Sequence, residues 1–296
     1  MLSPEELQRR LTGIGSSDIP EVIGVGYRDR GAIGVYLEKR QLIESIPDNE
    51  MMEWGRRLEE PIAVKAGEEL GLKLVELDKR DLPLRHHQRE WMLATPDRVE
   101  LDQETGHPVE GVECKNPHQF SGKNWGPSGS KRLPLRVIAQ VTWQMEVVGL
   151  DRWHVACLIG GNDFRLYTVH YHEGLARKLI AAGEKFWFEH VQKGVPPEPD
   201  ASPGWAAYFK SQFPEHTVEV LEANEKDERL AHQLYIARTR EKKWKTVKTE
   251  CENRLKFRMS DAGVLHGEFG RITWQKNGKA RGRAFRPTFR QDQQES

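Results

Sequence analysis

The stretch GVECKNP, residues 111–117, places a carboxylate and an ammonium group two positions apart in a short apolar run. Residues i and i+2 of an extended strand point to the same face of a sheet, so Glu113 and Lys115 are expected side by side. The earlier segment ATPDR, residues 94–98, adds a second acid, Asp97, sixteen positions before Glu113. If the two segments pair as a hairpin, Asp97 and Glu113 converge at one point beside Lys115.

This combination of charges favours a metal-dependent site. Two carboxylates at one point repel each other, and a cation between them removes that cost. Oxygen ligands at a partly open site suit magnesium, with manganese as a substitute. A lysine beside such a metal can orient or deprotonate an attacking water, or stabilise charge on a phosphate oxygen. The pattern is therefore typical of a phosphodiesterase, although E-x-K alone more often marks an exposed cross-strand ion pair, with Asp97 as a turn cap.

Composition sets the broad class of protein. The chain has 296 residues, of which 37% are hydrophobic and 30% charged, with a mean hydropathy of −0.71. No apolar run approaches the ~18 residues that a membrane helix needs, and the N-terminal MLSPEELQRRL lacks the apolar core of a signal peptide. Three widely spaced cysteines without metal-ligand spacing suit a reducing compartment. We therefore expect a cytoplasmic protein without a membrane partner.

The first two thirds of the chain show an α/β pattern. Apolar residues at helical spacing predict helices over residues 53–70, 134–149 and 173–193. Strands are expected at residues 91–100 and 109–116, joined by a turn at 101–107. A second hairpin is expected where residues 153–159 and 164–171 flank the turn sequence GGND.

A proline-rich stretch predicts a domain boundary. VPPEPDASPG, residues 195–204, holds four prolines and favours a linker over residues 196–204. It would separate a nuclease domain, residues 1–195, from an extension, residues 205–296. Within the extension, residues 224–258 predict a long charged helix, partly buried or in a coiled-coil arm. The remainder predicts a basic hairpin that turns at Asn277-Gly278.

Charge is distributed unevenly along the chain. Residues 205–296 hold 19 Lys and Arg against 13 Asp and Glu, a balance of +6, and residues 1–204 hold 26 against 32, a balance of −6. Seven basic residues and no acid lie between positions 271 and 290, interleaved with Trp274, Phe285 and Phe289. This segment predicts either contacts with nucleic-acid phosphates and bases or a solvated basic hairpin that packs its aromatic side chains.

Five blocks of sequence together resemble the lambda exonuclease / YqaJ-like viral recombinase family of the PD-(D/E)xK nuclease superfamily. In chain order they are RLTGIGSSD (10–18), WGRRLEE (54–60), ATPDR (94–98), GVECKNP (111–117) and IAQVTWQM (138–145). The resemblance covers about residues 10 to 171. It implies a restriction-endonuclease-like core, a central mixed sheet flanked by helices, with a C-terminal helical arm and basic β-hairpin beyond the minimal enzyme.

The resemblance also implies roles for individual residues. Asp97 and Glu113 match metal ligands, together with the backbone carbonyl of Cys114. Lys115 matches the lysine beside the attacking water. Glu59 matches a helix carboxylate at the second-metal or water position, with Glu60 as the alternative if the register is shifted by one. Gln140 matches a glutamine that helps to position the catalytic groups.

A second group of residues matches the family's pocket for a 5′-terminal phosphate. Arg10 and Ser17 match the pair that holds this phosphate, and Thr95 stands where a small hydroxyl residue is expected near it. A guanidinium fork and a hydroxyl suit a doubly charged terminal phosphate. A structural interpretation of these residues also stays open. Arg9 and Arg10 can be surface charges, and Ser16 and Ser17 can be helix caps.

The function implied by the resemblance is metal-dependent 5′-to-3′ degradation of linear double-stranded DNA, which leaves 3′ single-stranded overhangs for phage-type recombination by strand annealing. The resemblance further implies a homotrimer that acts on double-stranded DNA ends with a single-strand annealing protein as partner. Two alternatives stay open. One is a structure- or site-specific DNA endonuclease of the same superfamily, and the other is a non-catalytic DNA-binding protein with this fold.

Overall fold

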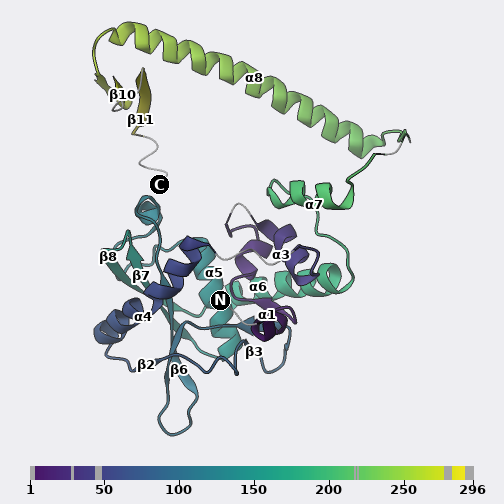
Figure 1. Ribbon diagram of the computed structural model, residues 1–296, viewed down its shortest axis with the longest axis vertical. Coiled ribbons are helices and arrows are strands. Elements are labelled where there is room, and N and C mark those ends of the chain that lie inside the picture. Colours follow the sequence, from purple (N-terminus) through teal and green to yellow (C-terminus); the bar gives the residue numbers. More distant parts are fainter. Residues whose placement is uncertain are drawn as a thin grey trace. The chain divides into compact units, whose positions relative to one another are not determined.

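The computed structural model describes residues 4–27, 30–43, 49–216, 218, 220–276 and 282–290. The chain divides into two compact units, Met1–Glu215 and His216–Ser296, which are described one at a time. Figure 1 labels their main helices and strands. Within the described residues, no helix is both long enough and apolar enough to cross a membrane.

The first unit is built on a five-stranded mixed sheet with the order β2-β5-β6-β7-β8. Strands β6 and β7 are parallel, and every other neighbouring pair is antiparallel. The strands are β2 (Leu74–Val75), β5 (Arg98–Leu101), β6 (Pro108–Lys115), β7 (Arg152–Ile159) and β8 (Asp163–His170). Both predicted hairpins, β5-β6 and β7-β8, are present.

One long helix packs on each face of this sheet. Alternate residues of a strand point to opposite faces, so Val112 and Cys114 of β6 meet Ile62 and Ala66 of helix α4 (Glu50–Leu70). The opposite face, including Val155 of β7, packs against helix α5 (Leu135–Val148). The expected central mixed sheet flanked by helices is therefore confirmed.

Local sequence explains where these two helices begin and end. The side chain of Asn49 accepts a hydrogen bond from the backbone N–H of Met52 at 3.0 Å, which caps the start of α4. Helix α5 starts directly after Pro134. Both helices end at a glycine in the left-handed conformation, Gly71 with φ 69° and Gly149 with φ 83°. The predictions for residues 53–70 and 134–149 are thus confirmed, with α4 three residues longer at its start.

The predicted strand at residues 91–100 is wrong in one respect, because it is two strands in two sheets. Strand β4 (Met92–Ala94) lies in a small sheet of order β1-β4-β3, with β1 (Ile14–Gly15) and β3 (Leu84–Arg85). The chain leaves this sheet at Thr95 and Pro96 and enters the large sheet at Arg98. Proline has no N–H for a strand ladder, which is why strand pairing stops here.

Shorter helices surround the sheets. The expected helix at residues 173–193 is present as α6 (Glu173–Lys185) followed by the π-helical segment η2 (Phe186–Gln192). Helical segments that were not predicted as elements also occur here, among them α1 (Pro4–Arg10), α2 (Ile19–Val22), α3 (Gly31–Lys39) and the 3-10 helix η1 (Gln119–Asn124).

The boundary between the two units differs from the predicted linker. Residues 196–204 lie within the first unit, and the division falls between Glu215 and His216. Helix α7 (Gly204–Gln212) follows the prolines, and its Trp205 is buried in the same core cluster as Ile33. The proline-rich stretch therefore connects two packed segments of one unit instead of separating two domains.

The second unit consists of one long helix and a three-stranded sheet. Helix α8 (Glu225–Met259) starts with a capping box between Asn224 and Asp227, which agrees with the helix predicted at residues 224–258. Strands β9 (Val264–Gly267), β10 (Gly270–Lys276) and β11 (Arg283–Phe289) form an antiparallel sheet of order β11-β10-β9. The basic hairpin is confirmed, β9 was not predicted, and the predicted turn at Asn277-Gly278 lies outside the described residues.

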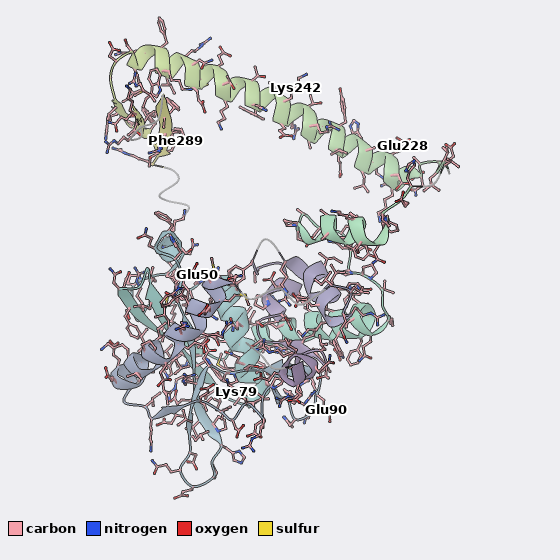
Figure 2. All side chains as sticks on the ribbon, viewed as in Figure 1. Glu50, Lys79, Glu90, Glu228, Lys242 and Phe289 are labelled. Carbon is pink, nitrogen blue, oxygen red and sulfur yellow. The ribbon has the colours of Figure 1, made fainter. Side chains whose placement is uncertain are left out.

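Helix α8 is exposed along most of its length, unlike the partly buried helix that its apolar residues suggested. Met259 is its buried residue, whereas Trp244 is 64% exposed. Figure 2 shows Glu228 and Lys242 projecting from the helix.

Candidate active site

Asp97 and Glu113 meet at the start of strand β5. The β5-β6 register pairs Arg98 with Val112, so one step further back Asp97 stands opposite Glu113. The backbone N–H of Cys114 donates to Asp97 Oδ2 at 2.8 Å, which fixes this carboxylate against strand β6. The structure thus brings together the two acids that the hairpin prediction placed at one point.

Glu113 is a buried carboxylate surrounded by donors. Its side chain is 2% exposed. Its Oε1 accepts hydrogen bonds from Lys115 Nζ and, at 2.6 Å, from Gln140 Nε2. Its Oε2 accepts from Gln144 Nε2 at 2.8 Å. A buried charge is tolerated only when it is paired and hydrogen-bonded, and both oxygens of Glu113 meet that condition.

Gln144 is the residue that the sequence analysis missed. It lies one helical turn after Gln140 on α5, and residues i and i+4 share one face of a helix. The sequence signal was a second amide four positions after the first on a helix that buries its apolar residues. Gln144 is fully buried, and its Oε1 has no hydrogen-bond partner among the described residues.

The charged groups of the site shift the pKa values of Asp97 and Lys115. Burial, reinforced by the Glu113 carboxylate, raises the pKa of Asp97 well above its usual value, and Lys115 only partly opposes this. Burial alone would lower the pKa of Lys115, but the Glu113 and Asp97 carboxylates outweigh it and raise that pKa. The Lys115 ammonium thus contacts Glu113 and acts on half-buried Asp97 through its charge.

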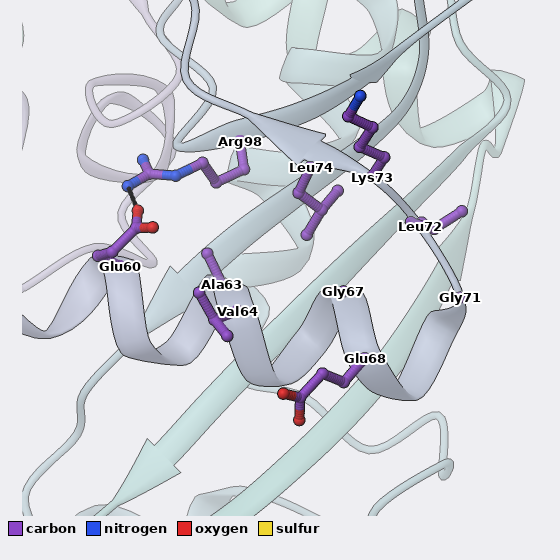
Figure 3. Close-up of a pocket in the computed structure, with 10 residues that line it drawn as sticks. All are labelled: Glu60, Ala63, Val64, Gly67, Glu68, Gly71, Leu72, Lys73, Leu74 and Arg98. Atoms are coloured by element: carbon purple, nitrogen blue, oxygen red, sulfur yellow. Dashed lines mark hydrogen bonds and ion pairs between the residues drawn. The ribbon is translucent and has the colours of Figure 1, made fainter.

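The structure separates the roles of Glu59 and Glu60 on α4. Glu60 Oε2 accepts from Arg98 Nη2 at 2.6 Å, and its side chain is 69% exposed. Figure 3 shows this pair beside a groove of about 480 Å³ between α4 and β2, whose lining does not include Asp97, Glu113 or Lys115. Glu59 is half-buried, and burial, opposed by Arg98 and reinforced by Glu113, raises its pKa. Glu60 is therefore engaged by Arg98, whereas the pKa of Glu59 responds to the charge of Glu113.

The donor set fits a divalent cation in part. Asp97 and Glu113 supply two carboxylates whose repulsion a cation would relieve, and Cys114 offers its carbonyl on the same strand. Among the described residues, however, no three His, Cys, Asp or Glu side chains gather in a metal-ligand arrangement. Backbone or water oxygens would have to complete the coordination, which is common for magnesium.

Two of the predicted phosphate residues, Arg10 and Ser17, lie in a segment whose backbone is held by the side chains of Asp18 and Lys39. The Asp18 carboxylate is buried; it accepts from the Gly15 N–H at 2.9 Å and pairs with Lys39 Nζ at 2.7 Å. The same ammonium donates to the backbone carbonyl of Arg10 at 2.7 Å. Burial opposes ionisation of Asp18, but Lys39 and Arg30 outweigh it and hold the pKa of Asp18 well below its usual value.

Arg9 and Arg10 differ in how their guanidinium groups are used. Arg9 donates to the carbonyls of Arg80 at 2.6 Å and Lys79 at 3.0 Å. The Arg10 guanidinium has no hydrogen-bond or ion-pair partner among the residues that the structure describes. Of these two neighbouring arginines, Arg10 is thus the one whose guanidinium group is available to bind a ligand.

The two hydroxyl residues of the predicted phosphate pocket are not joined to Arg10 directly. Ser17 is exposed and Thr95 is half-buried, two residues before Asp97. In the described part of the chain, no hydrogen bond links the side chains of Arg10, Ser17 and Thr95. The N-cap of α2 is Asp18, so the alternative of Ser16 or Ser17 as a helix cap is not observed.

In the basic hairpin, two of the predicted aromatic side chains are already covered by cations. The Arg283 guanidinium lies 3.8 Å from the Trp274 ring centroid and donates to the carbonyls of Ser260 and Ala262. Lys256 Nζ lies 4.9 Å from the centroid of Phe285. The exposed basic residues are Arg271, Lys276, Arg286 and Arg290, whereas Lys279 and Arg281 lie outside the described residues.

Comparisons with known proteins bear on the first unit. Residues 7–151 match the model of the YqaJ-like viral recombinase domain. No curated protein matches the chain. Two similar solved structures are the alkaline exonuclease LHK-Exo from Laribacter hongkongensis and LHK-Exo in complex with dAMP. Each is 17% identical with a TM-score of 0.51, and the match covers 65% of this chain and 94% of that one.

At this identity the structural similarity establishes the shared fold. The family match starts before Arg10 and ends after Gln144, so it spans all five sequence blocks and every candidate site residue. The resemblance seen in those blocks is thereby confirmed. Residues 7–151 of this chain are a YqaJ-like viral recombinase domain, carried on a restriction-endonuclease-like fold.

Proposed function

We propose that this protein is a metal-dependent 5′-to-3′ exonuclease of linear double-stranded DNA that leaves 3′ single-stranded overhangs for recombination by strand annealing. The observation that carries the proposal is the convergence of Asp97, Glu113 and Lys115 at one strand pair within a recombinase domain. The name of the similar structure, an alkaline exonuclease, supports the same class of reaction.

In this proposal Asp97, Glu113 and the carbonyl of Cys114 hold magnesium, with manganese as a substitute and Glu59 as a further acid. The bound ion would supply Lewis-acid polarisation of the scissile phosphate and a more acidic water. The position of Asp97 opposite Glu113 supports a cation there, because the charge of Glu113 disfavours ionisation of Asp97 and a cation between the two carboxylates would relieve that cost.

The protein's own groups have distinct tasks in this site. Gln140 and Gln144 hold the two oxygens of Glu113, and therefore orient its remaining lone pairs. The Cys114 N–H does the same for Asp97. Lys115, kept protonated by its neighbours, can stabilise negative charge on the attacked phosphate or orient the attacking water.

The preference for an end would come from Arg10. A 5′-terminal phosphate carries more charge than an internal diester, and an unpaired guanidinium fork with nearby hydroxyls suits it. Arg10 meets this requirement because Lys39 and Asp18 fix its backbone while its side chain stays unpaired among the described residues. Ser17 and Thr95 complete the proposed pocket when DNA is bound.

The proposal extends to assembly and partners. A homotrimer around the DNA and a single-strand annealing protein would follow from membership of this kind of recombination system. The exposed basic residues of the second unit would bind DNA phosphates and prolong each encounter.

The decisive experiment is digestion of end-labelled linear duplex in magnesium. Substrates with a 5′-phosphate and with a 5′-hydroxyl are compared, beside closed circular duplex and a chelator control. We expect shortening of the 5′-phosphorylated strand, slower cutting of the hydroxyl end, and no cutting of the circle or in chelator. Cleavage of the closed circle would favour the endonuclease alternative. Binding without any cleavage in magnesium or manganese would favour a non-catalytic DNA-binding protein.

A further inference from the structure

A third side chain shares the face of α5 that reaches the site. Arg136 lies in the first turn of this helix, four positions before Gln140 and eight before Gln144. Residues at this spacing form one stripe along a helix. Since Gln140 and Gln144 both donate to Glu113, Arg136 stands one turn further out along the same stripe.

Arg136 packs on an exposed aromatic ring. Its guanidinium carbon lies 4.7 Å from the ring centroid of Tyr27, which is 64% exposed. The Tyr27–Arg136 pair therefore lies at the first turn of α5, one helical turn before Gln140, which donates to Glu113.

Arg136 also lacks an acidic partner. It is half-buried, and within the described residues it makes no hydrogen bond or ion pair. Three other buried or half-buried arginines of this unit are paired, Arg98 with Glu60, Arg165 with Asp163 and Arg30 with Asp18, whereas half-buried Arg10 has no partner among the described residues. A guanidinium that is partly removed from water without an anion is costly, which indicates that its anion comes from a ligand.

We propose that Arg136, supported by the ring of Tyr27, binds a phosphate of the DNA strand at the entrance to the active site. The inference rests on the proposed function for the identity of the ligand. A guanidinium fork matches two phosphate oxygens, and the flat face of an aromatic ring holds that fork in place. The site differs from the proposed end pocket, since Arg10 belongs to α1 and Arg136 to α5.

Metal-free binding tests this contact without any cleavage. Binding of 5′-phosphorylated linear duplex is measured in chelator over a range of salt concentrations. Arg136→Gln is expected to weaken binding about tenfold, the loss of one charge-assisted hydrogen-bonding group. The slope of log affinity against log salt should fall by about 0.9, the value for one duplex phosphate. Arg177→Gln is the matched control, because Arg177 is an exposed arginine of α6 paired with Glu173, and its slope should not change.

The role of Tyr27 is tested by a double-mutant cycle. Tyr27→Phe keeps the ring face and should bind DNA as the wild type does. Tyr27→Leu should lose about two- to fivefold in affinity when Arg136 is present, and nothing further in the Arg136→Gln protein. An equal loss in both backgrounds would show that Tyr27 acts on its own, and would overturn the pair. If Arg136→Gln does not fold, as judged by its thermal unfolding, Arg136→Met, which keeps an unbranched stem without the charge, replaces it in the salt titration and in the cycle.

Failure of this inference can be told apart from failure of the proposed function. Wild-type protein that digests DNA, together with an unchanged salt slope in Arg136→Gln, would overturn the Arg136 contact alone. Wild-type protein that binds but does not digest would overturn the exonuclease, while the salt slope would still report on Arg136.

Discussion

The candidate active site and helix α8 are both rich in charge, yet the charges are used in opposite ways. In the site, Glu113 is almost fully buried and contacts the Lys115 ammonium, and half-buried Asp97 accepts from the Cys114 N–H. Along α8, acids and bases pair one turn apart in the open, as Arg229 does with Glu225 at 3.6 Å and side-chain exposures of 74% and 95%.

This difference shows that burial, and not the number of charges, determines how strongly a charged group affects stability and the pKa values of its neighbours. Water screens the pairs of α8, and such surface pairs stabilise a protein by about 0–1 kcal/mol. Burial reduces that screening, so the charge of Glu113 raises the pKa of both Asp97 and Lys115. Substitutions should therefore have large effects in the site and small ones along α8.

The largest effect is expected from Glu113→Gln. The amide cannot serve as an anionic ligand, so cleavage of linear duplex in magnesium should fall by about a thousandfold or more, roughly 4 kcal/mol of barrier. Asp97→Ala and Lys115→Ala should lose cleavage to a similar extent, while metal-free DNA binding remains. Initial digestion rates measure all three.

Glu110→Gln is the matched control on the same strand. Glu110 is also buried, but it lies on the opposite face of β6 and pairs with Arg152 and His154. It should lose stability and retain cleavage at a temperature where it is folded. Equal loss of cleavage in Glu110→Gln and Glu113→Gln would show that cleavage depends on buried charge in general and not on the position of Glu113 in the site.

The next effect concerns the boundary between the two units. A chain that ends at Glu215 keeps the core and the site, so we expect it to fold and to cleave DNA, with weaker and less salt-dependent binding. A chain that ends at residue 200 loses Trp205 from the core, where removal of a tryptophan costs about 3–5 kcal/mol. Thermal unfolding of the two truncations should separate them clearly. Equal stability would show that α7 is not part of the first unit.

Arg10→Ala should have an intermediate effect, limited to the choice of DNA end. The preference for 5′-phosphate over 5′-hydroxyl duplex should fall by about ten- to a hundredfold, which corresponds to about 1.5–3 kcal/mol. Arg9→Ala should leave this preference intact and lower stability instead, since Arg9 holds the carbonyls of Lys79 and Arg80. Rates on two duplexes that differ only in that phosphate measure the effect. A wild-type preference in Arg10→Ala would place the phosphate pocket elsewhere.

A smaller effect is expected on stability from Asp97→Asn. The folded state raises the pKa of Asp97, so ionisation of this acid costs stability as pH rises above the unfolded-state pKa. The amide removes that cost and can still accept from the Cys114 N–H. In chelator the variant should gain on the order of 1 kcal/mol at pH 8 and less at pH 4. Denaturant unfolding at the two pH values tests this, and a loss of stability at pH 8 would contradict it.

The smallest effect is expected on α8. Arg254 and Glu250 form an exposed pair one turn apart at 2.5 Å. Glu250→Gln should change the free energy of unfolding by no more than about 0.5 kcal/mol and leave cleavage unchanged. A change above 1 kcal/mol would show that this helix face is covered in the assembled protein.

Much of the fold could be predicted because its signals are local. Alternation over residues 109–116 and the turn at 101–107 are enough to pair two strands and to bring Asp97 opposite Glu113. Caps and glycines set the ends of α4 and α5 within a few residues. These features depend on neighbours in the chain, which a sequence displays directly.

Other features depended on packing between distant segments. Nothing local shows that Trp205 returns to the core of the first unit, so the prolines before it looked like a boundary between domains. The split of residues 91–100 between two sheets likewise depends on which strands lie alongside. Competition among long-range partners decides such cases.

The sequence by itself determined the acids, the lysine and the family to which their spacing belongs. The tertiary structure alone decided which further side chain joins them, Gln144 beside Gln140, and that Glu60 pairs with Arg98. The physical reason is that a period of two or 3.6 residues fixes the face on which a side chain lies. Only the packing of α4 and α5 on opposite faces of the sheet fixes which of those side chains reaches a buried carboxylate.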